Sequence, residues 1–215
     1  MMSGKLYENG LRLYTLDTML LTDDAYFQTC YHQLSASRRA KVDGYLFWKD
    51  KRLSLGAGML LDQGLREYGL RESEVRIGQK KNGKPYLPDY PLIHFNLAHS
   101  ETMVLVAFAD AEVGCDIEYT KKADMELAKH CFRPEEYAYL AGLAKEAQDS
   151  AFFRLWTLKE SFLKATGMGM ELPMHTFGFD VSGDSIKVRQ TYDGYEYKIK
   201  QYRDGRYWAA VCIQR

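Results

Sequence analysis

The order of secondary structure that the sequence predicts occurs twice along this chain, and this doubling constrains the fold more than any other feature. Segments with helical apolar spacing cover residues 35–47, 49–68, 124–143 and 150–166. In each half of the chain, such helices are followed by short strand-like segments, an order typical of α+β folds. We therefore expect two similar α+β halves related by a pseudo-twofold axis, residues 1–112 and 113–215, each with packed helices and an antiparallel sheet.

Turn signals between the strand-like segments predict how those strands pair. The segments are residues 12–16, 74–79, 84–87, 103–108, 113–118, 186–191, 195–202 and 207–213. The dipeptide Asn82-Gly83 tolerates positive φ and predicts a hairpin around it. The segment 103–108 is expected to pair with 113–118 across the acidic turn at 110–112. The last three segments, separated by Asp-Gly dipeptides, predict an antiparallel meander.

Charge and cysteine content narrow the classes of function. Lys plus Arg and Asp plus Glu both total 29, so the whole molecule has no net field that would attract nucleic acid or an anionic membrane. The four cysteines show no metal-binding spacing, and the first 13 residues lack the apolar stretch of a signal peptide. We expect a cytoplasmic protein without a nucleic-acid or membrane partner. Residues 83–85, Gly-Lys-Pro, also lack the flanking residues of a P-loop.

Two carboxylates stand two residues apart in the predicted strand 113–118. Asp116 and Glu118 would project from the same face, because strand side chains alternate. Two such carboxylates are half of a site for a divalent cation. Taken alone, however, such a pair is more often the solvated face of a strand.

The helix predicted over 150–166 adds a third acid and a lysine. Trp156, Glu160 and Lys164 follow one another at four-residue intervals and therefore share one stripe of the helix. An ordinary exposed Glu-Lys pair also explains Glu160 and Lys164.

Basic and histidine side chains upstream could bind an anion. His99 is expected at a junction between a loop and the strand 103–108, where its ring can donate a hydrogen bond. Arg38 and Lys41 belong to a segment in which basic residues outnumber acidic ones. The alternatives are an ordinary surface histidine and a solvated helix face.

In combination, these segments resemble the 4′-phosphopantetheinyl transferase superfamily, specifically its larger, Sfp-type branch, which activates surfactin synthetase and similar synthases. The matching segments, in family order, are residues 83–85 (Gly-Lys-Pro), 95–100 (Phe-Asn-Leu-Ala-His-Ser), 114–118 (Gly-Cys-Asp-Ile-Glu) and 156–169, which begins Trp-Thr-Leu-Lys-Glu. The resemblance spans residues 35 to about 173. It implies the α+β fold of this family and a monomer.

The resemblance also implies roles for individual residues. Asp116, Glu118 and Glu160 would hold a magnesium ion, which prefers oxygen ligands and keeps several waters. Glu160 and Lys164 would be the catalytic residues, with Glu160 as the proton acceptor, directly or through water. The residues implied to contact the co-substrate coenzyme A are Arg38, Lys41, Ser54, Lys84, His99 and Lys164. Residues 1–112 would thus supply nucleotide and phosphate contacts, and residues 113–215 the metal carboxylates and the catalytic helix.

The implied reaction transfers 4′-phosphopantetheine from coenzyme A to a serine of an apo acyl or peptidyl carrier protein, releasing 3′,5′-ADP. The carrier, an acidic helical domain, would dock near Lys121, Lys122, Met125, Cys131 and Phe132. Such carriers serve polyketide, non-ribosomal peptide or fatty acid biosynthesis. The alternative is a non-catalytic coenzyme A or nucleotide-binding module of the same fold.

Two positions depart from the family pattern. Ala98 precedes the motif histidine where serine is usual, and Arg38 stands where lysine is common. Neither change removes a charge. A lost hydroxyl donor would weaken phosphate binding by roughly 1 to 3 kcal/mol if nothing substitutes for it.

Overall fold

The chain forms two compact units in the computed structural model, which describes residues 3–8, 10–181 and 186–215. Unit 1 contains Met1–Lys80 and Pro85–Asp110, and unit 2 contains Lys81–Lys84 and Ala111–Arg215. The predicted halves divided the chain after residue 112. The structure differs in assigning residues 111–112 and the short segment 81–84 to the second unit.

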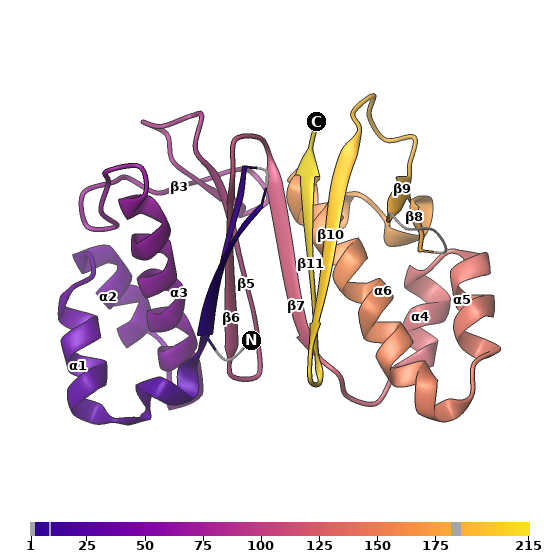
Figure 1. Cartoon of the computed structure of the whole chain (residues 1–215), viewed down its shortest axis with the longest axis horizontal. Helices are drawn as coiled ribbons and strands as arrows, with labels where there is room; N and C mark the ends of the chain where they lie inside the picture. The colour runs from indigo at the N-terminus through magenta and orange to yellow at the C-terminus, as the bar shows by residue number, and fades with distance from the viewer. Residues whose placement is uncertain (1–2, 9, 182–185) are drawn as a thin grey trace. The chain divides into compact units, whose positions relative to one another are not determined.

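Unit 1 is an antiparallel sheet covered by helices. Its elements are β1 Ser3–Glu8, β2 Leu11–Asp17, the 3-10 helix η1 Thr18–Thr22, α1 Asp24–His32, α2 Ala36–Asp43, α3 Trp48–Arg66, β3 Gly78–Gln79, β4 Pro85–Tyr86, β5 His94–Ser100 and β6 Met103–Ala109. The sheet order is β1-β2-β6-β5, and β3 and β4 form a separate small hairpin. Helices α1, α2 and α3 all lie on one side of this sheet (Figure 1).

Close contact between α3 and β6 forms the centre of the unit 1 core. Leu61 and Leu65 of α3 are fully buried together with Phe108 of β6. A Cβ atom added to Gly64 would lie 2.0 Å from the Phe108 ring. The glycine therefore allows the aromatic ring to pack directly against the helix backbone.

Unit 2 repeats this plan with a smaller sheet. Its elements are β7 Val113–Tyr119, α4 Met125–Cys131, α5 Pro134–Ala141, α6 Lys145–Thr166, η2 Gly169–Glu171, η3 Met174–Thr176, β8 Gly178–Asp180, β9 Lys187–Arg189, β10 Tyr197–Asp204 and β11 Tyr207–Gln214. The sheet order is β10-β11-β7, and β8 pairs with β9 in a second, two-stranded sheet. Helix α6 packs on the larger sheet, and α4 and α5 lie beyond it (Figure 1).

The two units share one topology, as the doubled sequence pattern predicts. In unit 1, β2 pairs with β6, the second strand of the β5-β6 hairpin. In unit 2, β7 pairs with β11, the second strand of the β10-β11 hairpin. Apart from the edge strand β1, which pairs with β2, each sheet thus has the order first strand, last strand, middle strand, with three α-helices following the first of these strands.

Several predictions of local structure were wrong. Strand β6 does not form a hairpin with β7, because β6 pairs with β2 and β5 while β7 pairs with β11. The segment 187–189 pairs with β8 and is not a third strand of a meander. The helix predicted over 124–143 is two helices, since Pro134 begins α5 and cannot continue α4. The helix predicted over 35–47 ends at Asp43. Strand β1 and helix α1 were not predicted.

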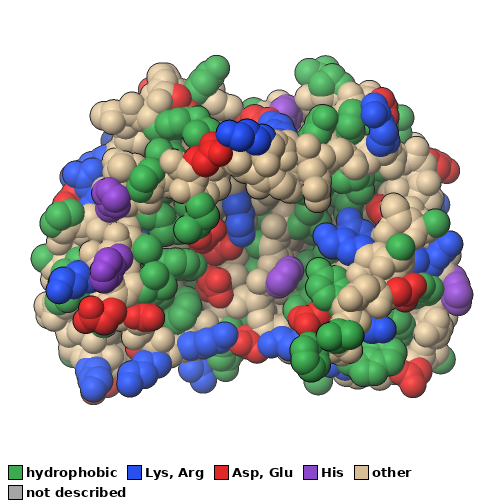
Figure 2. Space-filling model, turned by 180° about the vertical axis from the view of Figure 1, so that it is seen from behind, with side chains coloured by type: hydrophobic (Ala, Val, Ile, Leu, Met, Phe, Trp, Pro, Cys, Tyr) green, Lys and Arg blue, Asp and Glu red, His purple; other side chains and the backbone are tan. Residues whose placement is uncertain are grey.

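The surface drawn in Figure 2 does not carry charges of one sign only. There, positive and negative side chains are interspersed among apolar and other groups. Among the described residues, no helix is both long and apolar enough to span a bilayer.

Candidate active site

A glycine allows strand β7 to approach helix α6 within unit 2. A Cβ atom added to Gly114 would lie 2.1 Å from the carbonyl oxygen of Ser161 and 2.2 Å from the amide nitrogen of Ala165. Contacts this short with backbone atoms cannot form, so only glycine permits this spacing. The strand residues that follow Gly114 are therefore held against the last turns of α6.

The close approach joins Asp116 of β7 to Lys164 of α6. The ammonium of Lys164 donates a hydrogen bond of 2.7 Å to Asp116 Oδ1. Asp116 is 4% exposed, and its second carboxylate oxygen, Oδ2, is buried without a hydrogen-bond partner among the described residues. Burial raises the pKa of Asp116, and the Lys164 charge opposes that shift. Burial alone would lower the pKa of Lys164, but the Asp116 carboxylate raises it above its ordinary value.

Glu160 lies one helical turn before Lys164 and interacts with the same pair. Burial raises the pKa of the Glu160 carboxyl, Lys164 opposes the shift, and the Asp116 charge adds to it. Glu160 is four residues from Lys164 on α6, and Lys164 bonds Asp116, so the three side chains form one charged cluster. We call Asp116, Glu160 and Lys164 the acid–lysine cluster.

The third predicted acid, Glu118, occupies the same face of β7 as Asp116, because the two are two residues apart in one strand. It is half-buried. Within the part of the chain that the structure describes, no three His, Cys, Asp or Glu side chains are arranged to hold one metal ion. The ammonium of Lys164 balances the negative charge of the Asp116 carboxylate.

Lys84 belongs to the short segment of unit 2 at the tip of the β3-β4 hairpin. Its ammonium donates to Glu112 Oε2 at 2.6 Å and to the carbonyl oxygen of Ala165 at 3.1 Å. The neighbouring Asn82 amide donates to the carbonyl oxygens of Gly167 and Met168. Segment 81–84 is thus bound to the C-terminal end of α6, close to Lys164.

Three other predicted residues are arranged around the contact of α2 with α3 in unit 1. The stem of Arg38 lies against Gly58, where an added Cβ would be 3.0 Å from Arg38 Cγ. Ser54, one turn earlier on α3, is 7% exposed, and its hydroxyl has no partner among the described residues. Lys41 is largely exposed, yet burial of its ammonium lowers the pKa, and the charge of Arg38 lowers it further. Arg38 and Ser54 therefore lie at the α2–α3 contact, and Lys41 lies one turn further along α2.

His99 occupies strand β5 and not the loop-to-strand junction that the sequence predicted. It stands opposite Val104 of β6 and is exposed, whereas its neighbours Ala98 and Ser100 are buried. Because neighbouring strand residues point to opposite faces, the Ala98 side chain projects away from the His99 face.

One of the expected carrier-docking residues is not accessible. Phe132 is 2% exposed and packs against Phe152 and Trp156, with ring centroids 5.4 and 6.2 Å away. Its predicted docking contact was therefore wrong. Lys121 and Lys122 are exposed.

Sequence reasoning assigned no role to Lys159, which the structure shows to be a buried anchor. Lys159 is 0% exposed, and its ammonium bonds Glu136 Oε2 at 2.8 Å. It also donates to the carbonyl oxygens of Met174 at 2.9 Å and Phe177 at 2.8 Å. Burial lowers the pKa of Lys159, and the Glu136 carboxylate opposes the shift. In the Lys159-Glu160 dipeptide, Lys159 therefore has a structural role, and Glu160 belongs to the acid–lysine cluster.

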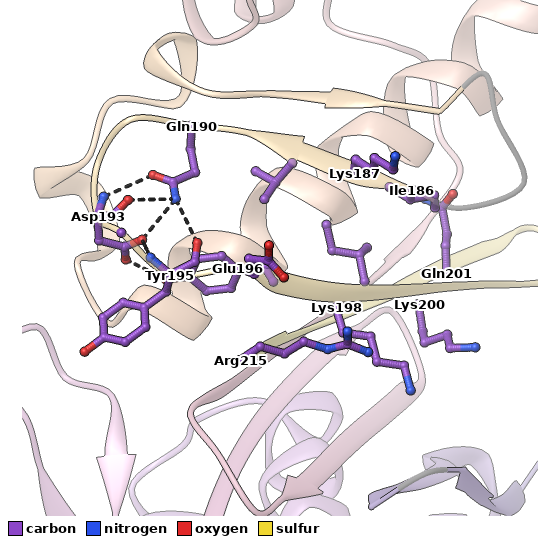
Figure 3. Close-up of a pocket in the computed structure, with 14 residues that line it drawn as sticks. Ile186, Lys187, Gln190, Asp193, Tyr195, Glu196, Lys198, Lys200, Gln201 and Arg215 are labelled. Atoms are coloured by element: carbon purple, nitrogen blue, oxygen red, sulfur yellow. Dashed lines mark hydrogen bonds between the residues drawn. The ribbon is translucent and has the colours of Figure 1, made fainter.

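A separate cavity in unit 2 contains none of the nine predicted site residues. Its volume is about 900 Å³, and it is lined by residues 186–188, 190, 193–201 and 215. The Gln190 amide and the Asp193 carboxylate hydrogen-bond within the loop along one wall of this cavity (Figure 3). The charged cluster, which does not line this cavity, is therefore the candidate site.

Two α+β units of one topology, one of them with a buried acid–lysine cluster, define an α+β protein suited to bind phosphate groups or a cation. Comparison with known proteins identifies the family. Residues 112–212 match the "4′-phosphopantetheinyl transferase superfamily", and residues 22–111 match "4′-phosphopantetheinyl transferase, N-terminal".

Individual relatives agree with these matches. The 4′-phosphopantetheinyl transferase Sfp of Bacillus subtilis is 35% identical over 182 residues, which cover 83% of this chain and 81% of that protein. The 4′-phosphopantetheinyl transferase psf-1 of Bacillus pumilus is 33% identical over 85% of this chain and 79% of its own length. A solved holo-[acyl-carrier-protein] synthase of Thermotoga maritima is 17% identical, with a TM-score of 0.42 over 49% of this chain and 63% of that chain.

The chain belongs to the 4′-phosphopantetheinyl transferase superfamily, in its Sfp-type branch. It is an enzyme of this type, so the catalytic interpretation is favoured over a non-catalytic binding module.

Proposed function

We propose that this enzyme transfers the 4′-phosphopantetheine group of coenzyme A to a serine hydroxyl of an apo acyl or peptidyl carrier protein. The observation that carries the proposal is the acid–lysine cluster in a chain that matches the transferase Sfp over 83% of its length. An enzyme accelerates phosphoryl transfer mainly by positioning the reactants and neutralising charge on the phosphates, so it needs no nucleophile of its own.

The serine oxygen of the carrier attacks the β-phosphorus of coenzyme A, and the bond from that phosphorus to the bridging oxygen breaks. 3′,5′-ADP leaves with the bridging oxygen and its electron pair. Glu160 accepts the serine proton, directly or through water, and its raised pKa suits a proton acceptor near neutral pH. Lys164 places positive charge beside the reacting phosphates.

Three carboxylates, Asp116, Glu118 and Glu160, are the proposed ligands of a magnesium ion. Asp116 Oδ2, which is buried and has no hydrogen-bond partner among the residues that the structure describes, and the repulsion between the Asp116 and Glu160 carboxylates both fit oxygen ligation of a divalent cation. Bound there, magnesium would neutralise charge on the pyrophosphate. Among the described residues the three carboxylates are not arranged around one ion, and Lys164 bonds Asp116 Oδ1, so binding of the cation would require these side chains to rearrange.

Coenzyme A contacts are proposed for six residues: Arg38, Lys41, Ser54, Lys84, His99 and Lys164. The Ser54 hydroxyl, which has no partner within the described part of the chain, and the mutually repelling charges of Arg38 and Lys41 support a phosphate at the α2–α3 contact. Lys84 is the weakest member, because Glu112 already neutralises its charge at 2.6 Å.

The partner is proposed to be an acidic helical carrier domain, and the enzyme a cytoplasmic monomer. Exposed Lys121 and Lys122 supply positive charge after Glu118 for such a partner. Light scattering after gel filtration would test the monomer, and charge reversal of both lysines should slow association with the carrier at low salt.

Incubation with apo carrier protein, coenzyme A and magnesium, followed by intact mass measurement, tests the function. We expect the carrier to gain one phosphopantetheine group, and a chelator to abolish the gain. Glu160→Gln should lower kcat by about 100-fold or more, since general base catalysis contributes at least this much. The matched control is Glu146→Gln, at an exposed position in the first turn of the same helix. No mass gain with any carrier would refute the function, and near-normal turnover of Glu160→Gln at saturating magnesium and coenzyme A would refute the base assignment.

A further inference from the structure

A buried carboxylate, Glu72, is attached to the start of helix α2. Glu72 is 1% exposed. Its Oε2 accepts the Ser35 backbone N–H at 2.8 Å, and its Oε1 accepts the Ser35 hydroxyl at 2.9 Å. A negative charge at a helix N-terminus is stabilised by the helix dipole. The negative charge of Glu72 is therefore stabilised although the side chain is buried.

The carboxylate is also fixed from the side of helix α3. The Glu72 backbone N–H donates to Asp62 Oδ1 of α3 at 2.9 Å. Asp62 is itself held by Arg66, at 2.8 Å, and by Arg71, at 3.3 Å. Glu72 thus connects the start of α2 to a charged network on α3.

One oxygen of Glu72, Oε1, is connected to Arg38 in two ways. The Ser35 hydroxyl that Glu72 accepts is itself the acceptor of the Arg38 backbone N–H, at 3.0 Å. Glu72 Oε1 also lies 3.7 Å from Arg38 Nε, as an ion pair. The Arg38 side chain is only 10% exposed. Across residues 3–8, 10–181 and 186–215, its guanidinium has no hydrogen-bond acceptor, so its N–H groups are available to a ligand.

Repulsion within α2 explains why Arg38 needs a counter-charge. Lys41 is three residues further along the helix, and the Arg38 charge lowers the pKa of its ammonium. Without an anion nearby, Arg38 would gain by swinging its long side chain towards water. Glu72 opposes this movement from the buried side and leaves the outer guanidinium nitrogens unoccupied.

We infer that Glu72 is a positioning residue that sets Arg38 for a phosphate group of coenzyme A. The inference rests on the proposed function, because the role of Arg38 as a phosphate contact belongs to it. Glu72 does not touch the ligand. It acts through Ser35 and Arg38, so its loss should weaken binding of coenzyme A and leave the transfer step intact.

Glu72→Gln is the primary variant, because it keeps the side-chain shape but removes the charge and sets an amide N–H₂ against the Ser35 N–H. We expect KM for coenzyme A to rise about tenfold and kcat to stay within about twofold. The affinity for 3′,5′-ADP, measured by calorimetry, should fall by about the same factor. The matched control, Glu74→Gln, makes the same change at an exposed position of the same segment and should alter neither value.

A double-mutant cycle separates positioning from a general structural role. In an Arg38→Ala background, Glu72→Gln should change KM for coenzyme A by less than about twofold, because its target is gone. A full tenfold effect in that background, or an unchanged KM in the single variant, would overturn the inference.

An unfolded Glu72→Gln variant and an inactive wild-type enzyme are distinguished from failure of the inference by two further measurements. If Glu72→Gln does not fold, Ser35→Ala removes only the hydroxyl bridge, and it should raise KM for coenzyme A about threefold; no rise would overturn the inference. If the wild-type enzyme neither binds coenzyme A nor modifies a carrier, the proposed function fails and the inference fails with it. If the wild type is active and Glu72→Gln matches it in KM, only the inference fails.

Discussion

Replacing Lys159 with methionine tests whether a buried ion pair holds helix α6 to the segment that follows it. Methionine keeps an unbranched side chain of similar length and removes only the ammonium. The change deletes the 2.8 Å pair with Glu136 and the hydrogen bonds to the carbonyl oxygens of Met174 and Phe177. Glu136 would stay 6% exposed, still accepting the backbone N–H groups of Arg133 and Phe179.

The expected cost follows from what remains after the deletion. Removing one partner of a buried pair typically costs about 3 to 5 kcal/mol, because the other charge is left uncompensated. Complete burial of the Lys159 ammonium carries a desolvation penalty, which the deletion recovers in part. We therefore expect a loss near the lower value, about 3 kcal/mol. For a chain of this length that corresponds to a fall in Tm of roughly 6 to 12 °C.

Thermal unfolding followed by near-ultraviolet circular dichroism is a suitable assay. The aromatic cluster of Phe132, Phe152 and Trp156 lies beside this region and reports on unit 2. Lys145→Met, at the exposed first residue of α6, is the matched control and should change stability by less than about 0.5 kcal/mol. The reasoning is refuted if Lys159→Met costs less than about 1 kcal/mol, or if high salt removes the difference, since a buried pair is weakly screened.

Three further changes test other parts of the structure. Gly114→Ala should destabilise unit 2 by about 3 kcal/mol or more and abolish transfer, because its Cβ meets α6 backbone atoms; a folded, active variant contradicts the packing. Burial alone would raise the pKa of Asp62, but the Glu72 N–H, Arg66 and Arg71 lower it. Because the pKa of Asp62 is lower in the folded state than in the unfolded chain, its ionised carboxylate stabilises the fold at pH values above the unfolded pKa, and this stability is lost as the pH falls through the folded pKa. The deficit in the free energy of unfolding of Asp62→Asn, measured in urea, should therefore shrink below about pH 4. His99→Ala should raise KM for coenzyme A, and an unchanged KM would remove His99 from the proposed phosphate contacts.

The sequence predicted well those features that depend on local patterns. Helix α6 and its end at Gly167, in the left-handed conformation at φ +71°, follow from apolar spacing and a glycine C-cap. The turn at Gly83, with φ +80°, follows from the Asn-Gly dipeptide. The same-face placement of Asp116 and Glu118 needed only the alternation of a strand.

Strand pairing was harder to predict because it depends on contacts distant in sequence. A short turn at 110–112 favoured a hairpin of 103–108 with 113–118. Yet β7 pairs with β11, about ninety residues later, and β6 pairs with β2, about ninety residues earlier. The doubled helix-and-hairpin pattern did predict two similar halves. If the strands of each half pair only with one another, the same pattern also predicts the pairings of β7 with β11 and of β6 with β2.

Lys159 illustrates what motif spacing leaves out. Its partner Glu136 is 23 residues away on α5, and the carbonyl acceptors lie in a 3-10 turn and the residue after it. No local pattern distinguishes a buried lysine from an exposed one within a helix. The adjacent Glu160 is half-buried and faces different neighbours, because neighbouring helix positions face about 100° apart. The same dipeptide therefore anchors the helix with one side chain and serves the acid–lysine cluster with the other.

The position of Asp116 depends on a residue without a side chain. Strand β7 can bring the Asp116 carboxylate to 2.7 Å from Lys164 only because Gly114 lets the strand lie against the backbone of α6. Any larger residue at 114 would push the strand outward and lengthen that contact before any charge was altered. The glycine of the Gly-x-Asp-x-Glu segment is therefore as necessary to the cluster as its carboxylates.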